Sequence, residues 1–341
     1  MKKIKVAIAG ATGFTGLELV KILLKHPGVE IVELFAQSNL GKAISYFDKS
    51  IKNTKKLPAI SSMKASNLSK IDVIFTALPH GEAHMVAKRL GKDSVLIDLS
   101  ADFRISSKSV YEKWYKVPHL AIDKQKNAVY GLSEINRSLI KKTNIISCPG
   151  CYPTSILLPL IPLLKKKLIN HKTIKADCKS GYSGAGKKTE DKNLYPNINE
   201  NLAIYGVGQH RHMPEIDQEL SKHAKKKINI TFTPHLIPTF RGILSTIYLD
   251  LSKNITSNMV YKCLVNFYKN ERFVKILDSK TMVNTNNVVN TNYCNIAVYD
   301  NRFKNQIIIA SSIDNLVKGA AGQAVQNFNI RYGFAENLSL N

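Results

Sequence analysis

Residues 4–16, IKVAIAGATGFTG, join an apolar run to glycines at positions 10, 13 and 16. The run 4–9 predicts a buried strand of a parallel sheet. Apolar residues then recur at helical spacing up to Pro27-Gly28, where the predicted helix ends: Leu17, Leu19, Val20, Leu23 and Leu24. A glycine turn between a strand and a helix lets the backbone approach a pyrophosphate, which the helix-terminal N–H groups then bind. The stretch therefore predicts a dinucleotide-binding unit.

The predicted contacts to this dinucleotide come from the turn and from the end of the second strand, 29–36. They are Gly10, Thr12, Gly13, Phe14, Thr15, Gly16 and Ser38. The second strand ends Phe35-Ala36-Gln37-Ser38, without the terminal carboxylate that would hold an NAD ribose. Ser38 and the nearby Lys42 favour a 2′-phosphate and hence NADP(H), whereas Glu33, earlier in the strand, would favour NAD.

The rest of the chain predicts an α/β protein with two domains. Further strand-like runs lie at 73–77, 95–99 and 144–147, with helical patterns between several of them, so a doubly wound parallel sheet is expected. After residue 150 the longer runs 174–178, 228–233, 243–251 and 294–299 predict an α+β domain with a mostly antiparallel sheet. A last helix is predicted from Asp314 to Asn329. The expected domains are 1–150 and 151–313, with 314–341 packing back on the first.

Composition narrows the classes of function. The 341 residues carry a net charge of +24, but the lysines are scattered and no nucleic-acid-binding motif is present, so a nucleic-acid partner is not expected. No apolar run is long enough to span a bilayer, and the N-terminus lacks a signal-peptide cleavage site. The odd count of five cysteines makes a disulfide framework unexpected and predicts a cytoplasmic protein.

Cys148-Pro149-Gly150-Cys151 permits two interpretations. A C-x-x-C motif can be a redox pair, but a second cysteine pair that would complete a zinc site is missing. The motif follows a strand and precedes the apolar helix pattern 154–164, with Pro153 suited to a first turn. A thiol at a helix N-terminus has a lowered pKa and is partly thiolate. We therefore predict that Cys151 is a nucleophile and that Cys148 is a buried residue at the strand end. No metal site is expected.

Three later motifs carry polar groups suited to binding or catalysis. Ser180 to Lys188 almost matches a phosphate-binding P-loop, but Lys188 stands where a magnesium-ligating hydroxyl belongs. Its backbone, around Ser183 and Gly184, is expected to bind an anionic cofactor or substrate. His210-Arg211-His212-Met213-Pro214-Glu215 offers acid/base groups with a carboxylate. In the run from His235 to Gly242, Arg241 is suited to a substrate carboxylate.

Together these segments resemble the N-acetyl-γ-glutamyl-phosphate reductases of arginine biosynthesis. The matching segments occur in the family's order along nearly the whole chain: 10–16 (GATGFTG), 77–81 (ALPHG), 97–105 (IDLSADFRI), 128–137 (AVYGLSEINR), 149–154 (PGCYPT), 180–187 (SGYSGAGK), 210–216 (HRHMPEI), 235–243 (HLIPTFRGI) and 314–326 (DNLVKGAAGQAVQ). The chain departs from the family pattern at Ser133, where a proline is usual, and at Glu82-Ala83, where a serine is common.

The resemblance implies an N-terminal Rossmann domain and an α+β catalytic and oligomerisation domain like those of the semialdehyde and glyceraldehyde-3-phosphate dehydrogenases. It implies that Cys151 is the nucleophile, that His210 is the acid/base group with His212 as its rival, and that Glu215 is the associated carboxylate. Asn315 would lie near the nicotinamide. The expected substrate contacts are Arg104, Arg211, His212 and Arg241.

The implied reaction is the NADPH-dependent reduction of N-acetylglutamyl 5-phosphate through a cysteine thioester, in a homo-oligomeric dimer or tetramer. Two alternatives stay open. One is the lysine-pathway relative that acts on a carrier-protein-bound aminoadipyl phosphate, whose acidic carrier would suit the net charge of +24. The other is a basic nucleic-acid-binding protein built on a dinucleotide fold.

Overall fold

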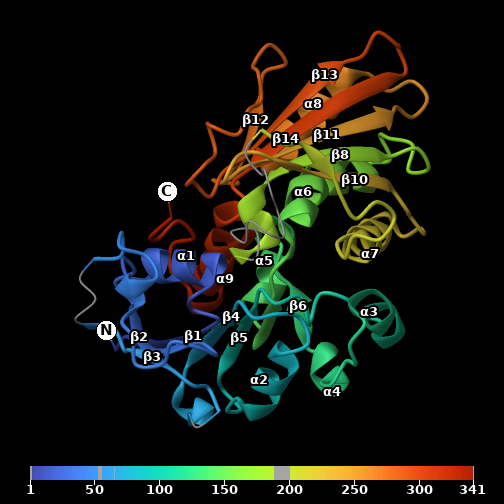
Figure 1. Cartoon of the computed structure of the whole chain (residues 1–341). Helices are drawn as coiled ribbons and strands as arrows, with labels where there is room; N and C mark the ends of the chain where they lie inside the picture. Colours follow the sequence, from blue (N-terminus) through green and yellow to red (C-terminus); the bar gives the residue numbers. More distant parts are fainter. Residues whose placement is uncertain (1, 53–55, 65, 188–199, 341) are drawn as a thin grey trace. The chain divides into compact units, whose positions relative to one another are not determined.

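A computed structural model describes residues 2–52, 56–64, 66–187 and 200–340, so Lys188 of the P-loop-like motif lies outside the described residues. The chain divides into two compact units, which are described one at a time (Figure 1). Unit 1 contains residues 1–149 and 320–341, and unit 2 contains residues 150–319.

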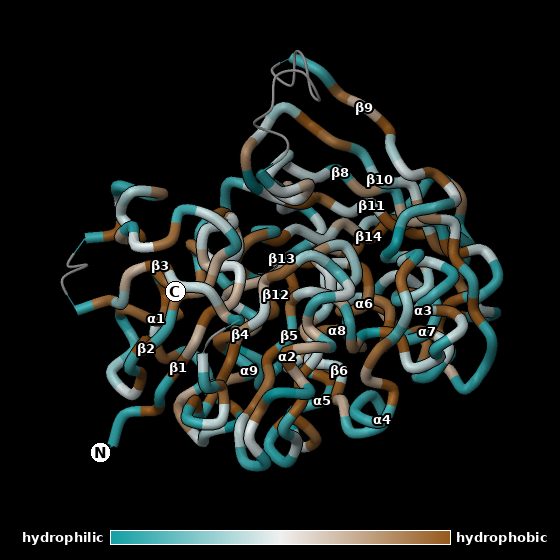
Figure 2. The backbone as a smooth tube through the Cα atoms, turned by 60° about the horizontal axis from the view of Figure 1, so that its bottom comes forward, coloured by the Kyte–Doolittle hydropathy of each residue, from teal (hydrophilic) through white to brown (hydrophobic). Residues whose placement is uncertain are grey.

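Unit 1 is built on a parallel sheet, as the alternating strand and helix patterns predicted. In the described residues its strand order is β3-β2-β1-β4-β5-β7-β6, and all six neighbouring pairs are parallel. The strands are β1 (Ile4–Ala9), β2 (Val29–Phe35), β3 (Ile60–Ser61), β4 (Val73–Thr76), β5 (Val95–Asp98), β6 (Ala128–Tyr130) and β7 (Ile145–Ser147). Figure 2 shows the central strands β1 and β4 as largely hydrophobic, and every residue of β4 and β5 is buried.

Unit 1 also contains six α-helices in its described residues, and the chain's C-terminal segment supplies one of them. They are α1 (Phe14–Leu23), α2 (Ala83–Arg89), α3 (Lys108–Tyr115), α4 (Ile122–Gln125), α5 (Ser133–Ile140) and α9 (Gly322–Tyr332), with short 3₁₀ turns η1 (Ile44–Tyr46) and η3 (Leu68–Lys70). Helix α9 packs against α1, α5 and β5. The His26 ring, just after α1, hydrogen-bonds the Asn329 side chain over 2.9 Å between Nε2 and Oδ1. The C-terminal helix is thus part of the same core as the glycine turn.

Unit 2 is built on a mixed sheet. In the described residues its strand order is β12-β13-β14-β11-β8-β10-β9, and only the pairs β12–β13 and β8–β10 are parallel. The strands are β8 (Lys175–Gly181), β9 (Ala203–Ile204), β10 (Thr231–Ile237), β11 (Ile243–Asp250), β12 (Val274–Leu277), β13 (Cys294–Asp300) and β14 (Gln306–Ile313). The predicted antiparallel character is therefore confirmed for most of the pairs.

One helix layer packs on this sheet. It consists of α6 (Cys151–Lys165), α7 (Met213–Ala224) and α8 (Ser257–Tyr268), and the 3₁₀ turn η4 (Tyr182–Ala185) follows β8. Helix α6 is the centre of the layer, because it contacts α7, α8, β11 and β14, and every residue from Tyr152 to Leu164 is buried. The alternation of buried and partly exposed residues along β11 is that of a sheet with one covered face.

The helix predicted from Asp314 to Asn329 begins later than expected. A π-helical turn spans Val317–Ala321, and α9 follows from Gly322. Asp314 caps the start of this turn, because its carboxylate oxygen Oδ1 accepts from the backbone N–H groups of Leu316 (2.7 Å) and Val317 (3.1 Å). Its carbonyl oxygen accepts from the N–H of Gly319, a five-residue spacing that widens the turn.

Candidate active site

The glycine turn of unit 1 has the geometry of a phosphate cradle. Gly10 has φ +83°, and a Cβ there would lie 2.2 Å from the carbonyl oxygen of Ala77, so only glycine fits. A Cβ at Gly16 would lie 2.1 Å from the carbonyl oxygen of Gly10. At Gly13, the N-cap of α1, no side chain caps the helix, and a Cβ would meet only the Gly10 oxygen at 3.5 Å. The space above the turn is therefore left to a ligand, which fits a dinucleotide pyrophosphate.

The end of β2 lies beside this turn. The backbone N–H groups of Gly10 and Ala11 both donate to the carbonyl oxygen of Phe35 at 3.0 Å. Ser38 and Lys42 follow, both exposed, and the Lys42 ammonium lies 3.7 Å from the centre of the Tyr46 ring. The Glu33 carboxylate accepts a hydrogen bond from the Ser61 hydroxyl at 3.0 Å, so it is held towards β3 within the sheet.

Cys151 is the first residue of α6 in unit 2. The N-cap is Gly150, in extended conformation and without a side-chain cap, and Cys151 is partly exposed. Cys148, at the end of β7 in unit 1, is fully buried, and burial raises the pKa of its thiol to about 12. All five cysteines lie in the described residues, and none of them forms a disulfide. The two thiols of the C-x-x-C motif therefore have different environments, and only Cys151 is exposed enough to react with a substrate.

Two residues of the HRHMPE motif contact Gly150, the residue before Cys151. The buried Glu215, in the first turn of α7, accepts a hydrogen bond from the backbone N–H of Gly150 at 2.8 Å. A Cβ at Gly150 would lie 2.4 Å from Nε2 of His212. The His212 ring therefore packs directly on the backbone at the start of α6, which explains why residue 150 is a glycine.

His210 lies in an aromatic enclosure. Its ring meets Tyr152, Tyr205 and Phe232 edge to face at centroid distances of 5.4–5.6 Å, and the His212 ring at 4.8 Å. Its Nδ1 lies 3.1 Å from the backbone nitrogen of His212, whose N–H donates to it, so the proton of the neutral ring is assigned to Nε2. Burial, and to a smaller extent the nearby Arg211 guanidinium, lower the pKa of His210 to about 4.

The remaining predicted residues of unit 2 form a second group at the end of β8. The Asn315 side chain accepts from the N–H of Gly242 (2.8 Å) and donates to the Ser183 hydroxyl (2.9 Å). A Cβ at Gly184 would lie 3.7 Å from its amide nitrogen. Arg241 pairs with the buried carboxylate of Asp314 at 3.3 Å. The structure thus ties the glycine–serine loop to the start of the C-terminal segment.

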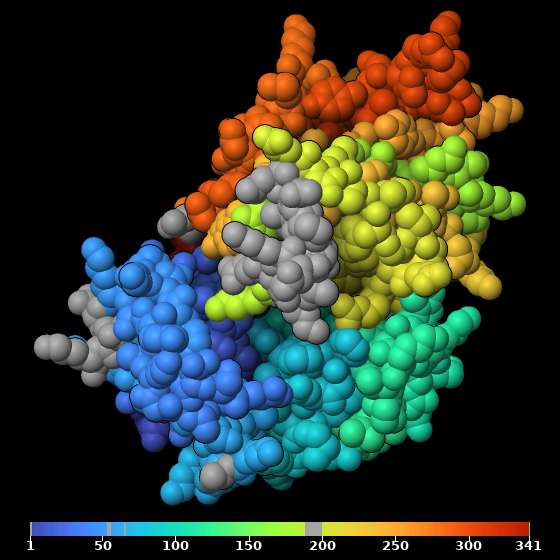
Figure 3. Space-filling model, in the orientation of Figure 1, coloured from blue at the N-terminus to red at the C-terminus, as the bar shows by residue number. Residues whose placement is uncertain are grey.

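The other two predicted arginines differ from this group. Arg104, in unit 1, is only 8% exposed, and its guanidinium donates to the carbonyl oxygens of Cys148 (2.7 Å) and Leu99 (3.2 Å). It therefore supports the backbone that leads to the C-x-x-C motif. Arg211 is exposed at the surface of unit 2, after a segment whose apolar side chains Leu202, Ile204 and Val207 are also exposed. Figure 3 shows this segment and α7, in yellow-green and yellow, at the surface of that unit.

Sequence patterns did not single out two residues that shape the site. A Cβ at Gly319 would lie 2.7 Å from Cβ of Cys151, so this glycine lets the π-helical turn approach the nucleophile. The Tyr152 hydroxyl donates to the carbonyl oxygen of His235 at 3.1 Å and accepts from the Tyr205 hydroxyl at 3.2 Å. The adjacency of Tyr152 to Cys151 was the available signal for the tyrosine, whereas Gly319 had no local signal.

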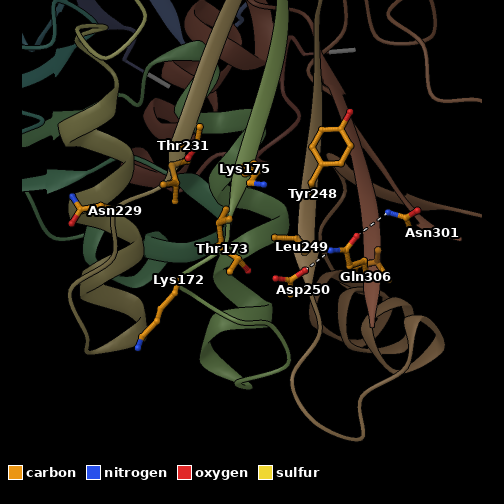
Figure 4. A pocket seen from close by; sticks show the side chains of 13 residues that line it. Lys172, Thr173, Lys175, Asn229, Thr231, Tyr248, Leu249, Asp250, Asn301 and Gln306 are labelled. Atoms are coloured by element: carbon orange, nitrogen blue, oxygen red, sulfur yellow. Dashed lines mark hydrogen bonds between the residues drawn. The ribbon is translucent and has the colours of Figure 1, made fainter. Parts of the chain in front are cut away.

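A hollow of about 760 Å³ in unit 2 lies at the other end of the sheet (Figure 4). Its lining includes Lys172, Lys175, Thr231 and Tyr248, and the Gln306 side chain bridges Asp250 and Asn301 there. Lys175 begins β8, whereas Gly181 ends that strand beside Ser183, about 20 Å away at ~3.3 Å per residue. The hollow contains none of the predicted site residues, so it is separate from the nucleophile.

The described residues also bear on metal binding and on membrane insertion. No group of three or more His, Cys, Asp or Glu side chains in that part of the chain is placed to hold a metal ion. Within the same residues, every helix is too short or too polar to cross a membrane.

Comparisons with known proteins agree with this architecture. Residues 5–143 match the family described as semialdehyde dehydrogenase, NAD binding domain, and residues 151–315 match semialdehyde dehydrogenase, dimerisation domain. Among solved structures, aspartate semialdehyde dehydrogenase II of Vibrio cholerae, complexed with ASA, has a TM-score of 0.74 at 18% identity, covering 98% of this chain and 99% of that one. The Candida albicans aspartate semialdehyde dehydrogenase with NADP has a TM-score of 0.68 at 17% identity, covering 99% and 100%. These two likenesses show the fold.

Curated relatives are far more similar in sequence. The N-acetyl-gamma-glutamyl-phosphate reductase of Thermoanaerobacter pseudethanolicus is 48% identical over 99% of this chain and 98% of that protein. The probable chloroplastic N-acetyl-gamma-glutamyl-phosphate reductase of Arabidopsis thaliana is 44% identical over 99% of this chain and 84% of that protein. Identity of this extent, together with the Rossmann unit and the Cys151 site, shows that the chain belongs to the N-acetyl-γ-glutamyl-phosphate reductase family of oxidoreductases.

Proposed function

We propose that this protein reduces N-acetyl-L-glutamyl 5-phosphate to N-acetyl-L-glutamate 5-semialdehyde and phosphate, the reductase step of arginine biosynthesis. The observation that carries the proposal is the partly exposed thiol of Cys151 at the start of α6, beside Gly150, whose backbone contacts both His212 and Glu215. The names of the full-length relatives specify the substrate.

The chemistry divides among residues of unit 2. The Cys151 thiolate attacks the acyl carbon, the acyl–phosphate bond breaks, phosphate leaves and a thioester forms. Bound NADPH supplies the hydride that reduces this thioester. The resulting thiohemiacetal on Cys151 collapses when its oxygen loses a proton, which breaks the carbon–sulfur bond and releases the aldehyde.

The geometry favours a division of labour between the two histidines. His210 keeps its proton on Nε2, and its lowered pKa keeps it neutral near pH 7. A neutral imidazole of this kind stabilises a developing oxyanion by donating a hydrogen bond. His212 packs at the N-cap of the nucleophile helix, so we assign to it the proton transfers at the thiol. Glu215 positions the helix start through Gly150.

The proposed cofactor is NADP(H). The glycine turn fits the pyrophosphate, and Ser38 and Lys42 follow the strand end where the adenosine ribose is bound in such folds. The carboxylate that would favour the unphosphorylated ribose belongs to Glu33, and Ser61 holds it within the sheet. A cytoplasmic homo-oligomer, assembled through the unit that matches a dimerisation domain, completes the proposal.

The test is an assay of the purified protein with N-acetylglutamate semialdehyde, inorganic phosphate and either NADP⁺ or NAD⁺. We expect phosphate-dependent reduction of NADP⁺, followed by absorbance at the nicotinamide band, and a lower kcat/KM with NAD⁺. Oxidation that does not require phosphate would contradict the acyl-phosphate mechanism. Preference for NAD⁺ would contradict only the assignment of the cofactor.

A further inference from the structure

The strand order of unit 1 places two loops on either side of the glycine turn. In doubly wound sheets a dinucleotide binds outside the carboxyl ends of the strands, with its adenosine half beside the end of the second strand. Here β1 lies between β2 and β4, so the loops after β2 and β4 flank the turn. Any contact between these two loops lies across the adenosine half of the crevice.

Such a contact exists between Gln37 and Glu82. The amide nitrogen Nε2 of Gln37 donates to both carboxylate oxygens of Glu82, at 3.2 and 3.4 Å. Gln37 lies two residues beyond β2, and Glu82 lies six residues beyond β4, immediately before α2. The two side chains therefore link the loops that flank the glycine turn.

The backbone on both sides of the bridge is anchored. The buried carboxylate of Asp102 accepts from the N–H groups of Gly81 (2.6 Å) and Ala83 (2.8 Å), on either side of Glu82. The N–H of Ala36, next to Gln37, donates to the carbonyl oxygen of Ser61 at 3.1 Å. Because the main chain is fixed, opening the bridge requires only side-chain rotation.

The bridge has a polarity that matches the edge of adenine. Gln37 presents a donor and Glu82 presents an acceptor. On one edge adenine presents the acceptor N7 next to the donor of its exocyclic amine N6. We propose that the adenine of the cofactor enters between these residues, accepting from Gln37 and donating its exocyclic amine to the Glu82 carboxylate. Glu82 would then determine specificity for the base. This inference rests on the proposed cofactor function of unit 1.

The test compares NADPH with reduced nicotinamide hypoxanthine dinucleotide phosphate, which carries a carbonyl oxygen in place of the amine and also an N1–H. On the edge that carries N7 the ring nitrogen remains an acceptor, and the new oxygen presents a second acceptor to the Glu82 carboxylate. Dissociation constants for this analogue and for NADPH are measured by titration of the full chain, followed by nicotinamide fluorescence. We expect the natural chain to bind NADPH more tightly, by about tenfold, the factor that one hydrogen bond to a charged group contributes.

The decisive variant is Glu82→Gln, which keeps the shape of the side chain but adds an N–H donor. We expect the ratio of the two dissociation constants to fall to about threefold or less, because the new amide can donate to the hypoxanthine oxygen. Glu30→Gln, an equal loss of charge at the exposed start of β2, is the matched control and should leave the ratio unchanged. Gln37→Leu should weaken both cofactors and preserve the ratio.

The outcomes separate this inference from the proposed function. Tight binding of both cofactors with equal affinity, or an unchanged ratio in Glu82→Gln, would overturn recognition of the base by Glu82 and leave the reductase proposal intact. Binding of neither cofactor would overturn both. Thermal unfolding of each variant, compared with the natural chain, identifies any loss of binding that comes from misfolding.

Discussion

Residues 10–13 and residues 148–150 both lead from a parallel strand into a helix, β1 into α1 and β7 into α6. Each helix has a glycine N-cap in extended conformation, Gly13 (φ −76°, ψ 165°) and Gly150 (φ −67°, ψ 161°), without a side-chain cap. The surroundings differ. A Cβ at Gly13 would have its nearest neighbour at 3.5 Å, whereas a Cβ at Gly150 would lie 2.4 Å from the His212 ring. The same local turn is thus open at Gly13 and enclosed at Gly150 by His212, to which we assign a catalytic role.

The largest expected difference between the two turns comes from the first residue of each helix. Phe14 begins α1 and Cys151 begins α6, so the proposed nucleophile belongs to the second turn. We expect Cys151→Ser to lower reductase activity by about 10⁴-fold or more, because a hydroxyl is a far weaker nucleophile than a thiolate at neutral pH. Cofactor affinity, measured by fluorescence titration, should stay unchanged. Cys263→Ser, on α8, is the matched control and should retain activity. An active Cys151→Ser variant would refute the thioester mechanism.

Because His210 and His212 have different surroundings beside the second turn, we expect their replacement to lower kcat to different extents. We expect His212→Asn to lower kcat by about 10³-fold, the scale of a lost general acid–base group. His210→Asn should cost about tenfold less, because its role is to donate one hydrogen bond from Nε2. The measurement is kcat against pH for both variants with NADP⁺ saturating. If His210→Asn is the more damaging change, the assignment of the two roles is reversed.

The two N-cap glycines provide the most direct pair of variants. We expect Gly150→Ala to displace the His212 ring and to lower kcat by about 10²-fold, while the Kd of NADPH stays unchanged. We expect Gly13→Ala to fold normally and to raise that Kd by about tenfold, because the methyl group occupies the space of the pyrophosphate. Fluorescence titration and steady-state kinetics on both variants measure the contrast. Equal effects on Kd and kcat in the two variants would show that the turns are not specialised.

The sequence predicted the bounds of the strands and helices more accurately in unit 1 than in unit 2. In unit 1 the signals are local. The run 4–9 matches β1 (Ile4–Ala9), and Gly10 and Gly16 are needed for contacts within a few residues or with the adjacent strand. In unit 2 the strand predicted at 228–233 begins at Thr231, and the helix predicted from Asp314 opens with a π-helical turn before α9 starts at Gly322.

The site of unit 2 depends on contacts between distant parts of the chain. Gly319 faces Cys151 and Glu215 binds the backbone of Gly150, and no spacing or periodicity encodes either pairing. The motif HRHMPE predicts acid/base chemistry, which stays a prediction, and the order of its two histidines along the chain could not say how each ring lies against α6. Packing determines this arrangement: the His212 ring lies against the backbone of Gly150, and the centre of the His210 ring lies 5.6 Å from that of the Tyr152 ring.

The smallest expected difference between the two turns is in their response to low pH. Residues 10–16 contain no titratable side chain, whereas the second turn lies beside His212 and His210. Burial lowers the pKa of His210 from 6.5 to about 4, so between these values the unfolded chain binds more protons than the folded one. The stability that His210 contributes is therefore present above pH 6.5 and is lost as the pH falls towards 4. We expect His210→Phe to reduce the decrease in unfolding free energy over this range by about 1–3 kcal/mol, measured by urea titration at each pH. His171→Asn, in the loop before β8, is the control and should leave the decrease unchanged. An identical pH dependence in His210→Phe and the natural chain would show that His210 is not buried in its neutral form, and the role assigned to its Nε2 proton would then be lost as well.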